Sequence, residues 1–246
     1  MIFERIVCGV DGSPAGFEAL RQAAALRSDD GRIVAMTVCE AGGDARAGAV
    51  EDATRQLIRE VPLAEARVID GAPVPSLLAA LERESATLLA VGTHGDRRSG
   101  TGLGGVATSM LQQAPCSVLV ARPSGETAWS PDRIVVGMDG SREALVAAVV
   151  AAELGDRPGA SVGTIAAEGG PRVDRPLLGE IENVERVPGH PVGVLVDASR
   201  EADLVVVGSR GLRAFEALGS VSERVAHQAR CSVLVIRPDQ PQEEEL

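Results

Sequence analysis

The chain has 246 residues, with 24 Lys and Arg against 35 Asp and Glu, so its formal net charge is −11. Apolar residues make up 45% of it, but only three Phe, one Trp and no Tyr are present, so Ala, Val and Leu must build the core. Nucleic acid is not an expected partner, because the chain lacks both a basic surface and aromatic residues that stack on bases. No apolar run approaches the ~20 residues of a membrane helix, and the acidic residues near residue 1 do not fit a signal peptide, so we expect a cytoplasmic protein without membrane contact.

Short β-branched runs alternate with longer helical patterns along the first half of the chain. The expected elements are a strand at 2–10, a helix at 14–27, a strand at 32–39, a helix at 46–60, a strand at 65–70, a helix at 74–85, a strand at 87–92, a helix at 104–114 and a strand at 116–121. The runs at 88–91 and 204–207 are apolar at every position, which is typical of central parallel strands covered on both faces. The pattern predicts an α/β fold of flavodoxin-like type, with an open five-stranded parallel sheet in the order 3-2-1-4-5 and helices on both faces.

The second half of the chain repeats the first. RIVCGVDGS at residues 5–13 returns as RIVVGMDGS at 133–141, with seven of nine residues identical. Three further matches follow in the same order: 71–74 with 189–192, 91–95 with 207–211, and 116–123 with 231–238. We therefore expect one domain at 1–123, a linker at 124–131, a second domain at 132–238 and a disordered acidic tail at 239–246.

The second copy is the shorter one. The helical pattern at 46–60 corresponds to a stretch at 167–176 that contains two Gly and two Pro. Such residues break helices, so the second copy is expected to lack this helix, to have at most four helices and to run irregularly across residues 167–180.

The most distinctive residues follow the first and the fourth strand of each copy. They are the segments 11–13, 92–95 and 104–106 in the first copy, and 139–141, 208–211 and 219–221 in the second. In an open sheet, ligands bind beyond the carboxyl ends of the strands, at the point where the strand order reverses and these two loops diverge to leave a crevice. Glycines allow close approach of the backbone, and free N–H groups at a helix start attract phosphate. The sequence therefore predicts an anion-binding site in each copy.

Over nearly its whole length, the chain resembles a tandem universal stress protein. Nucleotide-binding members of that family carry G-x2-G-x9-G-[S/T] after the fourth strand and an Asp after the first. The resemblance implies an adenine nucleotide, ATP or AMP/cAMP, with a divalent ion such as Mg²⁺ offsetting charge. It implies that Asp11 and Asp139 face the adenosine part and that Val38 lies beside the base. The residues implied to surround the phosphates are Gly92, Gly95, Gly104, Gly105 and Val106 in the first copy, and Gly208, Gly211, Gly219, Ser220 and Val221 in the second.

Both copies depart from the family pattern. The first has eight residues between Gly95 and Gly104, and Gly105 replaces the hydroxyl residue. The second keeps Gly-Ser but has seven residues between Gly211 and Gly219. A nucleotide-free interaction module of the same fold therefore stays open beside a nucleotide-binding sensor or regulator of the stress response.

Enzymatic chemistry has little support in the sequence. Slow ATP hydrolysis stays open, but no general base and no second acidic metal ligand are visible. Residues 102–107 match a dinucleotide fingerprint, but they do not follow the first strand, which argues against a Rossmann oxidoreductase. The three His have no metal-ligand spacing, and the four Cys are interpreted as structural thiols in or beside strands. We expect no catalytic residues and no protein-bound metal site.

The last strand of each copy, at 116–121 and 231–236, is apolar and would form one edge of its sheet. An exposed apolar edge promotes aggregation. We therefore expect the two edges to pair about a pseudo-twofold axis, as separate chains do in the family that this one resembles. The tandem chain would then be a dimer within one polypeptide, and further association into a homodimer is compatible with the sequence.

Overall fold

Ten strands among the described residues form one continuous sheet. The computed structural model describes residues 3–39, 64–94, 102–125, 129–156, 159–169, 183–209 and 221–238, together with the single positions 48, 52, 54, 55 and 59. The first half of the sheet consists of β1 (Phe3–Gly9), β2 (Arg27–Cys39), β3 (Ala64–Asp70), β4 (Leu88–Gly92) and β5 (Ser117–Ala121). The second half consists of β6 (Arg133–Gly137), β7 (Ser161–Ala167), β8 (Val184–Val187), β9 (Leu204–Gly208) and β10 (Ser232–Ile236).

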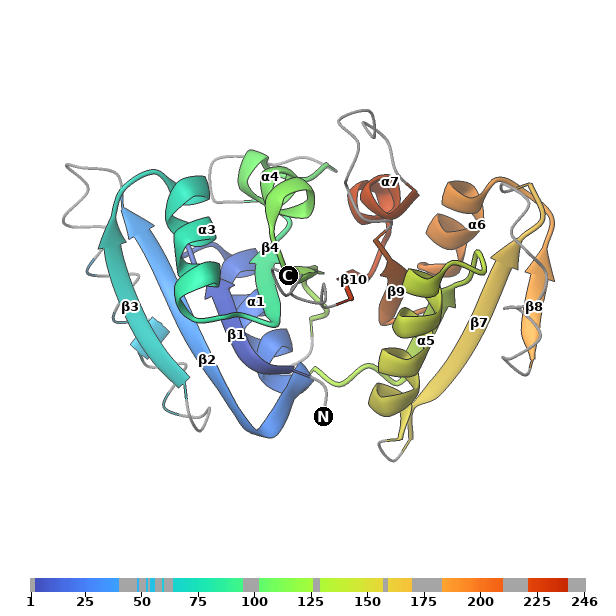
Figure 1. Cartoon of the computed structure of the whole chain (residues 1–246), viewed down its shortest axis with the longest axis horizontal. Coiled ribbons are helices and arrows are strands. Elements are labelled where there is room, and N and C mark those ends of the chain that lie inside the picture. The colour runs from blue at the N-terminus through green and yellow to red at the C-terminus, as the bar shows by residue number, and fades with distance from the viewer. Residues whose placement is uncertain are drawn as a thin grey trace, which may run out of the picture.

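The strand order is β3-β2-β1-β4-β5-β10-β9-β6-β7-β8 (Figure 1). Strands within each half are parallel, and the predicted order 3-2-1-4-5 is confirmed in both halves. At the centre β5 and β10 pair antiparallel, with Val118 opposite Val235 and Val120 opposite Val233. The pairing of the two last strands, expected from their apolar sequences, is therefore present, and neither of them is an exposed edge.

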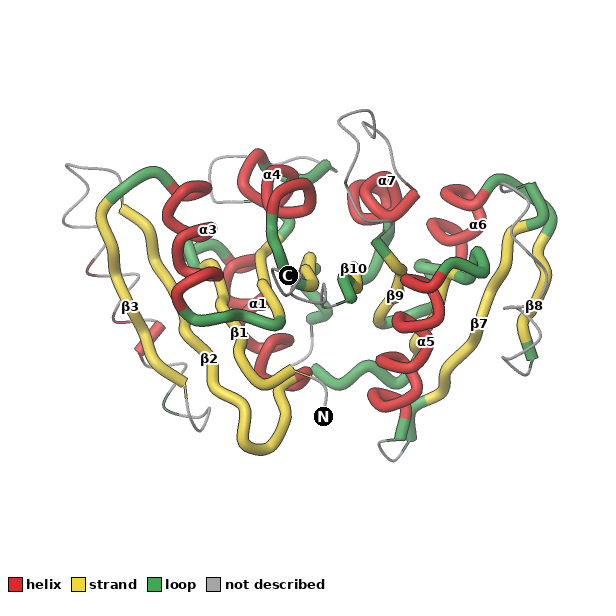
Figure 2. Tube along the Cα trace, in the orientation of Figure 1, coloured by secondary structure: helices red, strands yellow, loops and turns green. Residues whose placement is uncertain are grey.

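Helices cover both faces of the sheet (Figure 2). They are α1 (Pro14–Leu26), α3 (Pro73–Arg83), α4 (Gly105–Gln113), α5 (Arg142–Gly155), α6 (Pro191–Ala198) and α7 (Val221–Gln228). One core cluster joins α1 and α5 to one face of both halves, and a second joins α3, α4, α6 and α7 to the other face. None of the helices in the described residues is both long enough and apolar enough to span a bilayer.

The central strands are buried on both faces, as their sequences predict. Leu88 packs into the cluster of α1 and α5, whereas its neighbour Leu89 packs into the cluster of α3 and α4. Both side chains are fully buried, and so are Leu204 and Val205 at the matching positions of β9. Burial of each such aliphatic side chain stabilises the folded state by about 1.5–3 kcal/mol relative to its exposure to water. Aliphatic residues alone can therefore build a stable core.

Serine side chains cross the junction between β5 and β10. The backbone N–H of Arg122 donates to Ser232 Oγ at 2.9 Å, and that of Arg237 donates to Ser117 Oγ at 3.1 Å. The two contacts are equivalent, because both residue pairs are related by the offset of 115 that relates the repeated segments 116–123 and 231–238. The repeated motif therefore forms the junction as well as the last strands.

Two arginine side chains also cross this junction. Arg122 donates to the carbonyl oxygens of Ala226, at 2.6 Å, and Cys231, at 3.1 Å. Arg237 donates to the carbonyl oxygen of Leu111. Ala226 and Leu111 lie near the carboxyl ends of α7 and α4, where the helix dipole favours a positive charge. Burial lowers the pKa of both arginines.

The start of β2 differs from the sequence prediction. The strand begins at Arg27, directly after α1, and a bulge separates the pairing of Phe3 with Arg27 from that of Arg5 with Arg32. The Arg27 guanidinium donates to the carbonyl oxygen of Gly31 at 2.6 Å and so closes the bulge. This side-chain contact explains why the polar residues 27–31 are part of the strand.

Three expectations fall wholly or partly outside the described residues. Within the helix expected at 46–60, the described positions Gly48, Asp52, Thr54 and Arg55 are helical. In the region at 167–180, the structure describes only the end of β7 and a turn at 168–169. The tail at 239–246 lies outside the described residues, so the lost helix and the disordered tail stay predictions.

Candidate functional site

The same turn follows the first strand of each half of the sheet. Asp11 Oδ1 accepts hydrogen bonds from the Ser13 backbone N–H at 3.0 Å and from Ser13 Oγ at 2.5 Å. Asp139 Oδ1 accepts the equivalent bonds from Ser141, at 2.9 and 2.6 Å. The residue between them is a glycine with positive φ, +82° at Gly12 and +75° at Gly140. Each Asp-Gly-Ser segment is therefore a preformed turn.

These turns also start the following helices. Ser13 Oγ accepts from the Gly16 N–H at 3.0 Å and caps α1, and Ser141 Oγ accepts from the Ala144 N–H at 3.2 Å and caps α5. The second carboxylate oxygen of Asp11 accepts no hydrogen bond within the described part of the chain, and the residue is exposed. One Asp11 oxygen thus holds the turn, and the other is available to a ligand.

The end of each fourth strand packs against the first turn of the helix that follows the first strand. A Cβ on Gly92, the last residue of β4, would lie 2.6 Å from the carbonyl carbon of Ala15 in α1. A Cβ on Gly208, the last residue of β9, would lie 2.5 Å from the carbonyl carbon of Glu143 in α5. The sequence interpretation assigned these glycines to the approach of a ligand, but the structure shows that the packing of strand against helix already requires them.

The start of α4 returns to the end of β4. The Gly104 N–H donates to the Thr93 carbonyl oxygen at 2.6 Å, and Gly104 is the N-cap residue of α4. Unlike Ser13 and Ser141, it has no side chain that could accept from the first N–H groups of the helix. A Cβ on the exposed Gly105 would meet no atom of the described residues within 4 Å. The helix therefore presents N–H donors without a side-chain cap, beside open space.

Several predicted residues thus gather at the carboxyl edge of the first half of the sheet. Asp11 and Gly92 lie against the first turn of α1, and Gly104 lies against the residues that follow Gly92. Val38 is near the end of β2, and both Val38 and Val106 pack half-buried against the cluster of α3 and α4. Gly95 lies outside the described residues.

In the second half, only part of the predicted site can be placed. Asp139 and Gly208 lie against α5 as their counterparts lie against α1, and Val221 begins α7. Gly211, Gly219 and Ser220 lie outside the described residues. Strand register places Ala167 of β7 where β2 has Val38, because Gly9 pairs with Met36 and Gly137 pairs with Ile165. The repeat alone did not reveal this substitution.

Other candidate chemical groups add little to the site. Among the described residues, no three His, Cys, Asp or Glu side chains are grouped as a metal site would require. All four cysteines are free thiols, and burial raises the pKa of Cys231 to about 12, which makes this thiol a poor nucleophile. His94, which follows Thr93, has a buried Nδ1 without a hydrogen-bond partner in the described part of the chain.

Sequence reasoning missed two buried residues, of which only Ser209 lies beside the site. Ser209, directly after Gly208, is 5% exposed, and its hydroxyl accepts from Arg237 Nε at 3.4 Å. Trp129, in the segment expected to be a linker, is 6% exposed and belongs to the core cluster of α1 and α5. The repeated Arg-Pro after each last strand was a signal for Arg237, but no sequence pattern indicated a contact with Ser209.

Comparisons with known proteins agree with this arrangement. The model of the universal stress protein family matches residues 2–122 and 172–237, and the chain belongs to that family. It is 28% identical to a universal stress protein of Mycobacterium tuberculosis, over 94% of this chain and 96% of that protein.

Solved structures support the same fold. A universal stress protein from Archaeoglobus fulgidus has a TM-score of 0.68 at 20% identity and covers 95% of this chain and 96% of its own. A protein of unknown function from Pseudomonas aeruginosa has a TM-score of 0.74 at 16% identity and covers 96% of this chain and 93% of its own. At these identities the similarity concerns the fold alone.

Proposed function

We propose that this universal stress protein binds an adenine nucleotide and acts in the cytoplasm as a stress-response sensor or regulator through its bound state. The observation that carries the proposal is the start of α4, where N–H groups without a side-chain cap face space that no described atom fills, at the edge of the sheet that also carries the Asp11 turn. Helix N-termini of this kind bind phosphate through N–H donors and the helix dipole. The open sheet places them at its reversal point, where such folds bind ligands.

Each residue of the site has a role in this proposal. The N–H groups of Gly105 and Val106 hold phosphate oxygens, and the free carboxylate oxygen of Asp11 accepts a hydrogen bond from the nucleoside. Val38 lies beside the base. In the second half the Asp139 turn, the counterpart of the Asp11 turn, faces the nucleoside. The proposed phosphate residues also include Gly92, Gly95, Gly208, Gly211, Gly219, Ser220 and Val221.

The residues present fit a nucleotide that brings its own divalent ion. The described residues hold no ready-made cluster of metal ligands, and Mg²⁺ is commonly bound through phosphates and one or two carboxylates. When bound, the ion would offset phosphate charge in a protein whose net charge is −11. Asp11 and Asp139, the carboxylates of the two Asp-Gly-Ser turns, would contribute to holding the ion together with the phosphates.

Nucleotide binding can be tested on the full chain purified without added nucleotide. Bound small molecules are extracted and identified, and the nucleotide-free protein is titrated with ATP, AMP and cAMP, with and without Mg²⁺. We expect saturable binding of at least one of them, weakened in Asp11→Ala and Asp139→Ala. Absence of binding by a folded protein would instead favour the nucleotide-free interaction module, and turnover of ATP abolished by the same variants would favour hydrolysis.

A further inference from the structure

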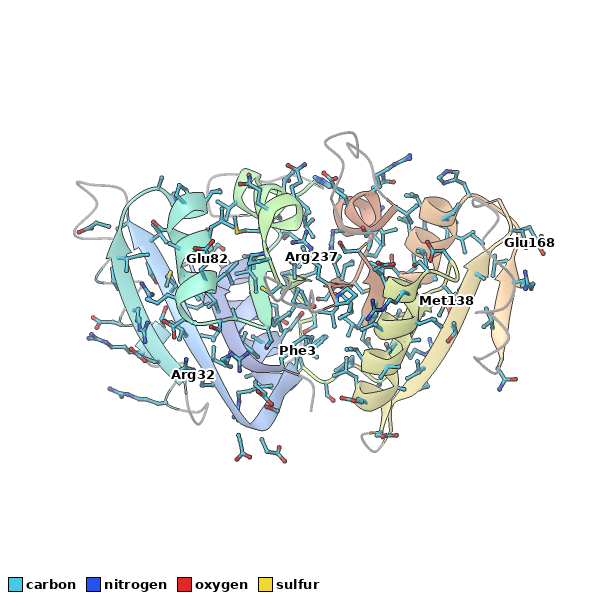
Figure 3. The ribbon with its side chains drawn as sticks, in the orientation of Figure 1. Phe3, Arg32, Glu82, Met138, Glu168 and Arg237 are labelled. Atoms are coloured by element: carbon cyan, nitrogen blue, oxygen red, sulfur yellow. The ribbon has the colours of Figure 1, made fainter. Side chains whose placement is uncertain are left out.

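Arg237 connects elements of both halves of the sheet. It follows β10, yet its backbone N–H donates to Ser117 Oγ of β5, and its Nη2 donates to the Leu111 carbonyl oxygen in the last turn of α4. Its Nε donates at 3.4 Å to Ser209 Oγ, at the start of the loop between β9 and α7. Figure 3 labels Arg237 between the two halves of the molecule. One guanidinium therefore joins an element of the first candidate site to a loop of the second.

The equivalent residue in the first half does not make the same connection. Arg122 donates to the carbonyl oxygens of Ala226 and Cys231, both in the second half. In the first half, Thr93 occupies the position that corresponds to Ser209. Among the described residues, the side chain of Arg122 makes no hydrogen bond with Thr93. The pseudo-twofold symmetry is broken at this point, so Arg122 provides a matched control.

Both groups that Arg237 contacts belong to elements that lead to a candidate site. The Ser209 side chain is buried, and its backbone N–H donates to the Ile236 carbonyl oxygen at 2.8 Å. α4 is a nine-residue helix, a rod about 14 Å long, with its free N–H groups at one end and Leu111 near the other. A displacement of the N-terminal end of α4, where phosphate is proposed to bind, therefore also moves Leu111 and the Arg237 contact near its carboxyl end.

We propose that Arg237 is a positioning residue that couples the two candidate sites, by tying the loop at Ser209 to the carboxyl end of α4. The proposal rests on the nucleotide binding proposed above. Different nitrogens of the guanidinium hold Leu111 and Ser209, so the two contacts do not compete. A ligand that orders one site therefore lowers the entropic cost of ordering the other, and the coupling is positive.

The coupling can be followed at the first site alone. Hydrogen exchange of the α4 amides, residues 105–113, is measured over a series of ATP concentrations in the presence of Mg²⁺. The readout is the ATP concentration that gives half-maximal protection. We call this concentration the midpoint. Ser209→Ala removes the hydroxyl and leaves the contact of Arg237 with Leu111 in place. We expect Ser209→Ala to raise the midpoint about fivefold, which is at the lower end of the range of coupling strengths between two sites.

Four further variants complete the test. Arg237→Gln and Asp139→Ala are expected to raise the midpoint as Ser209→Ala does, and the double variant Ser209→Ala with Asp139→Ala is expected to raise it no further. Arg122→Gln removes an equivalent junction contact and is expected to leave the midpoint unchanged. Thermal unfolding of each variant confirms that it is folded, and Ser209→Ala tests the coupling even where a larger change prevents folding.

The outcomes separate this proposal from the proposed function. If ATP protects α4 in the wild-type chain but Ser209→Ala leaves the midpoint where it was, the coupling is refuted and nucleotide binding stands. An equal shift in Arg122→Gln would also overturn it, because loss of any junction contact would then have the same effect. If ATP protects no part of the folded wild-type chain, the proposed nucleotide binding itself fails.

Discussion

Glycines of the candidate site have opposite surroundings, although they look alike in the sequence. Gly92 and Gly208 are pressed against the first turn of a helix, where a Cβ would lie 2.5–2.7 Å from backbone atoms. Gly105 faces open space. The sequence placed all three at the site but could not distinguish these cases, because the distinction depends on neighbours from other elements.

Gly105 is the position at which a new side chain should improve the site. The family pattern has a hydroxyl residue there, and the structure leaves room for one. We expect Gly105→Ser to strengthen ATP binding at the first site roughly tenfold, the effect of about 1.5 kcal/mol from one hydrogen bond to a charged group. Calorimetric titration of the full chain measures the change.

Gly105→Ala is the matched control for this prediction. It adds the Cβ without the hydroxyl, so it should leave the affinity near that of the wild-type chain. Equal affinities for the Ser and Ala variants would show that no phosphate lies within reach of residue 105.

Gly92 should tolerate no side chain. The Cβ of Gly92→Ala would collide with the backbone of Ala15, which cannot move without shifting α1. Overpacking of this kind costs about 1–3 kcal/mol, which urea unfolding can measure. Gly193→Ala is the control. Gly193 is on the exposed side of α6, and the new Cβ would have no atom of the described residues within 4 Å, so this variant should not lower the free energy of unfolding. A loss of stability in both variants would indicate a general effect of the added methyl group.

At the scale of elements, the end of α3 is fixed to β2 and β3 by charge. The Glu84 carboxylate, whose side chain is 8% exposed, contacts Arg67 at 2.6 Å, Arg83 at 3.0 Å and Arg32 at 3.3 Å. Figure 3 labels Arg32 and also Glu82, which lies in α3 two residues before Glu84. Hydrogen bonds from Arg83 and then Arg67 lower the pKa of Glu84 below its ordinary value of 4.5, against the opposing effect of burial.

This cluster makes part of the stability depend on pH. Because the pKa of Glu84 is lower in the folded state, its stabilisation is complete above pH 4.5 and is lost as the pH falls through the folded-state value. Glu84→Gln should therefore lower the free energy of unfolding by about 2 kcal/mol at neutral pH and by much less at about pH 3. Urea unfolding at the two pH values tests this, with the exposed Glu82→Gln as control. A difference that persists unchanged in acid would contradict the assignment.

Most element boundaries could be predicted from the sequence, because the spacing of apolar residues and the capping residues at helix ends are local signals. The helix starts at Pro14 and Gly105 follow directly from Ser13 and Gly104. The start of β2 at Arg27 could not be predicted in this way. It depends on an arginine that closes a bulge and on pairing with Phe3, neither of which appears in the local pattern.

At the scale of the whole molecule, the antiparallel pairing of β5 and β10 turns two open sheets into one. The apolar last strands were sufficient to predict this pairing, because an uncovered edge of that kind is a liability. The side chains that fix it were not predictable, since Arg122 and Arg237 contact residues more than 100 positions away in the chain. For the same reason the link from Arg237 to Ser209 emerges only from the fold.

The most direct test of the account is a crystal structure of the full chain grown with ATP and Mg²⁺. We predict that phosphate oxygens lie within hydrogen-bond distance of the backbone nitrogens of Gly105 and Val106, with the ribose beside Asp11. A well-ordered, unliganded start of α4 at saturating ATP, or a nucleotide bound away from both candidate sites, would contradict the account.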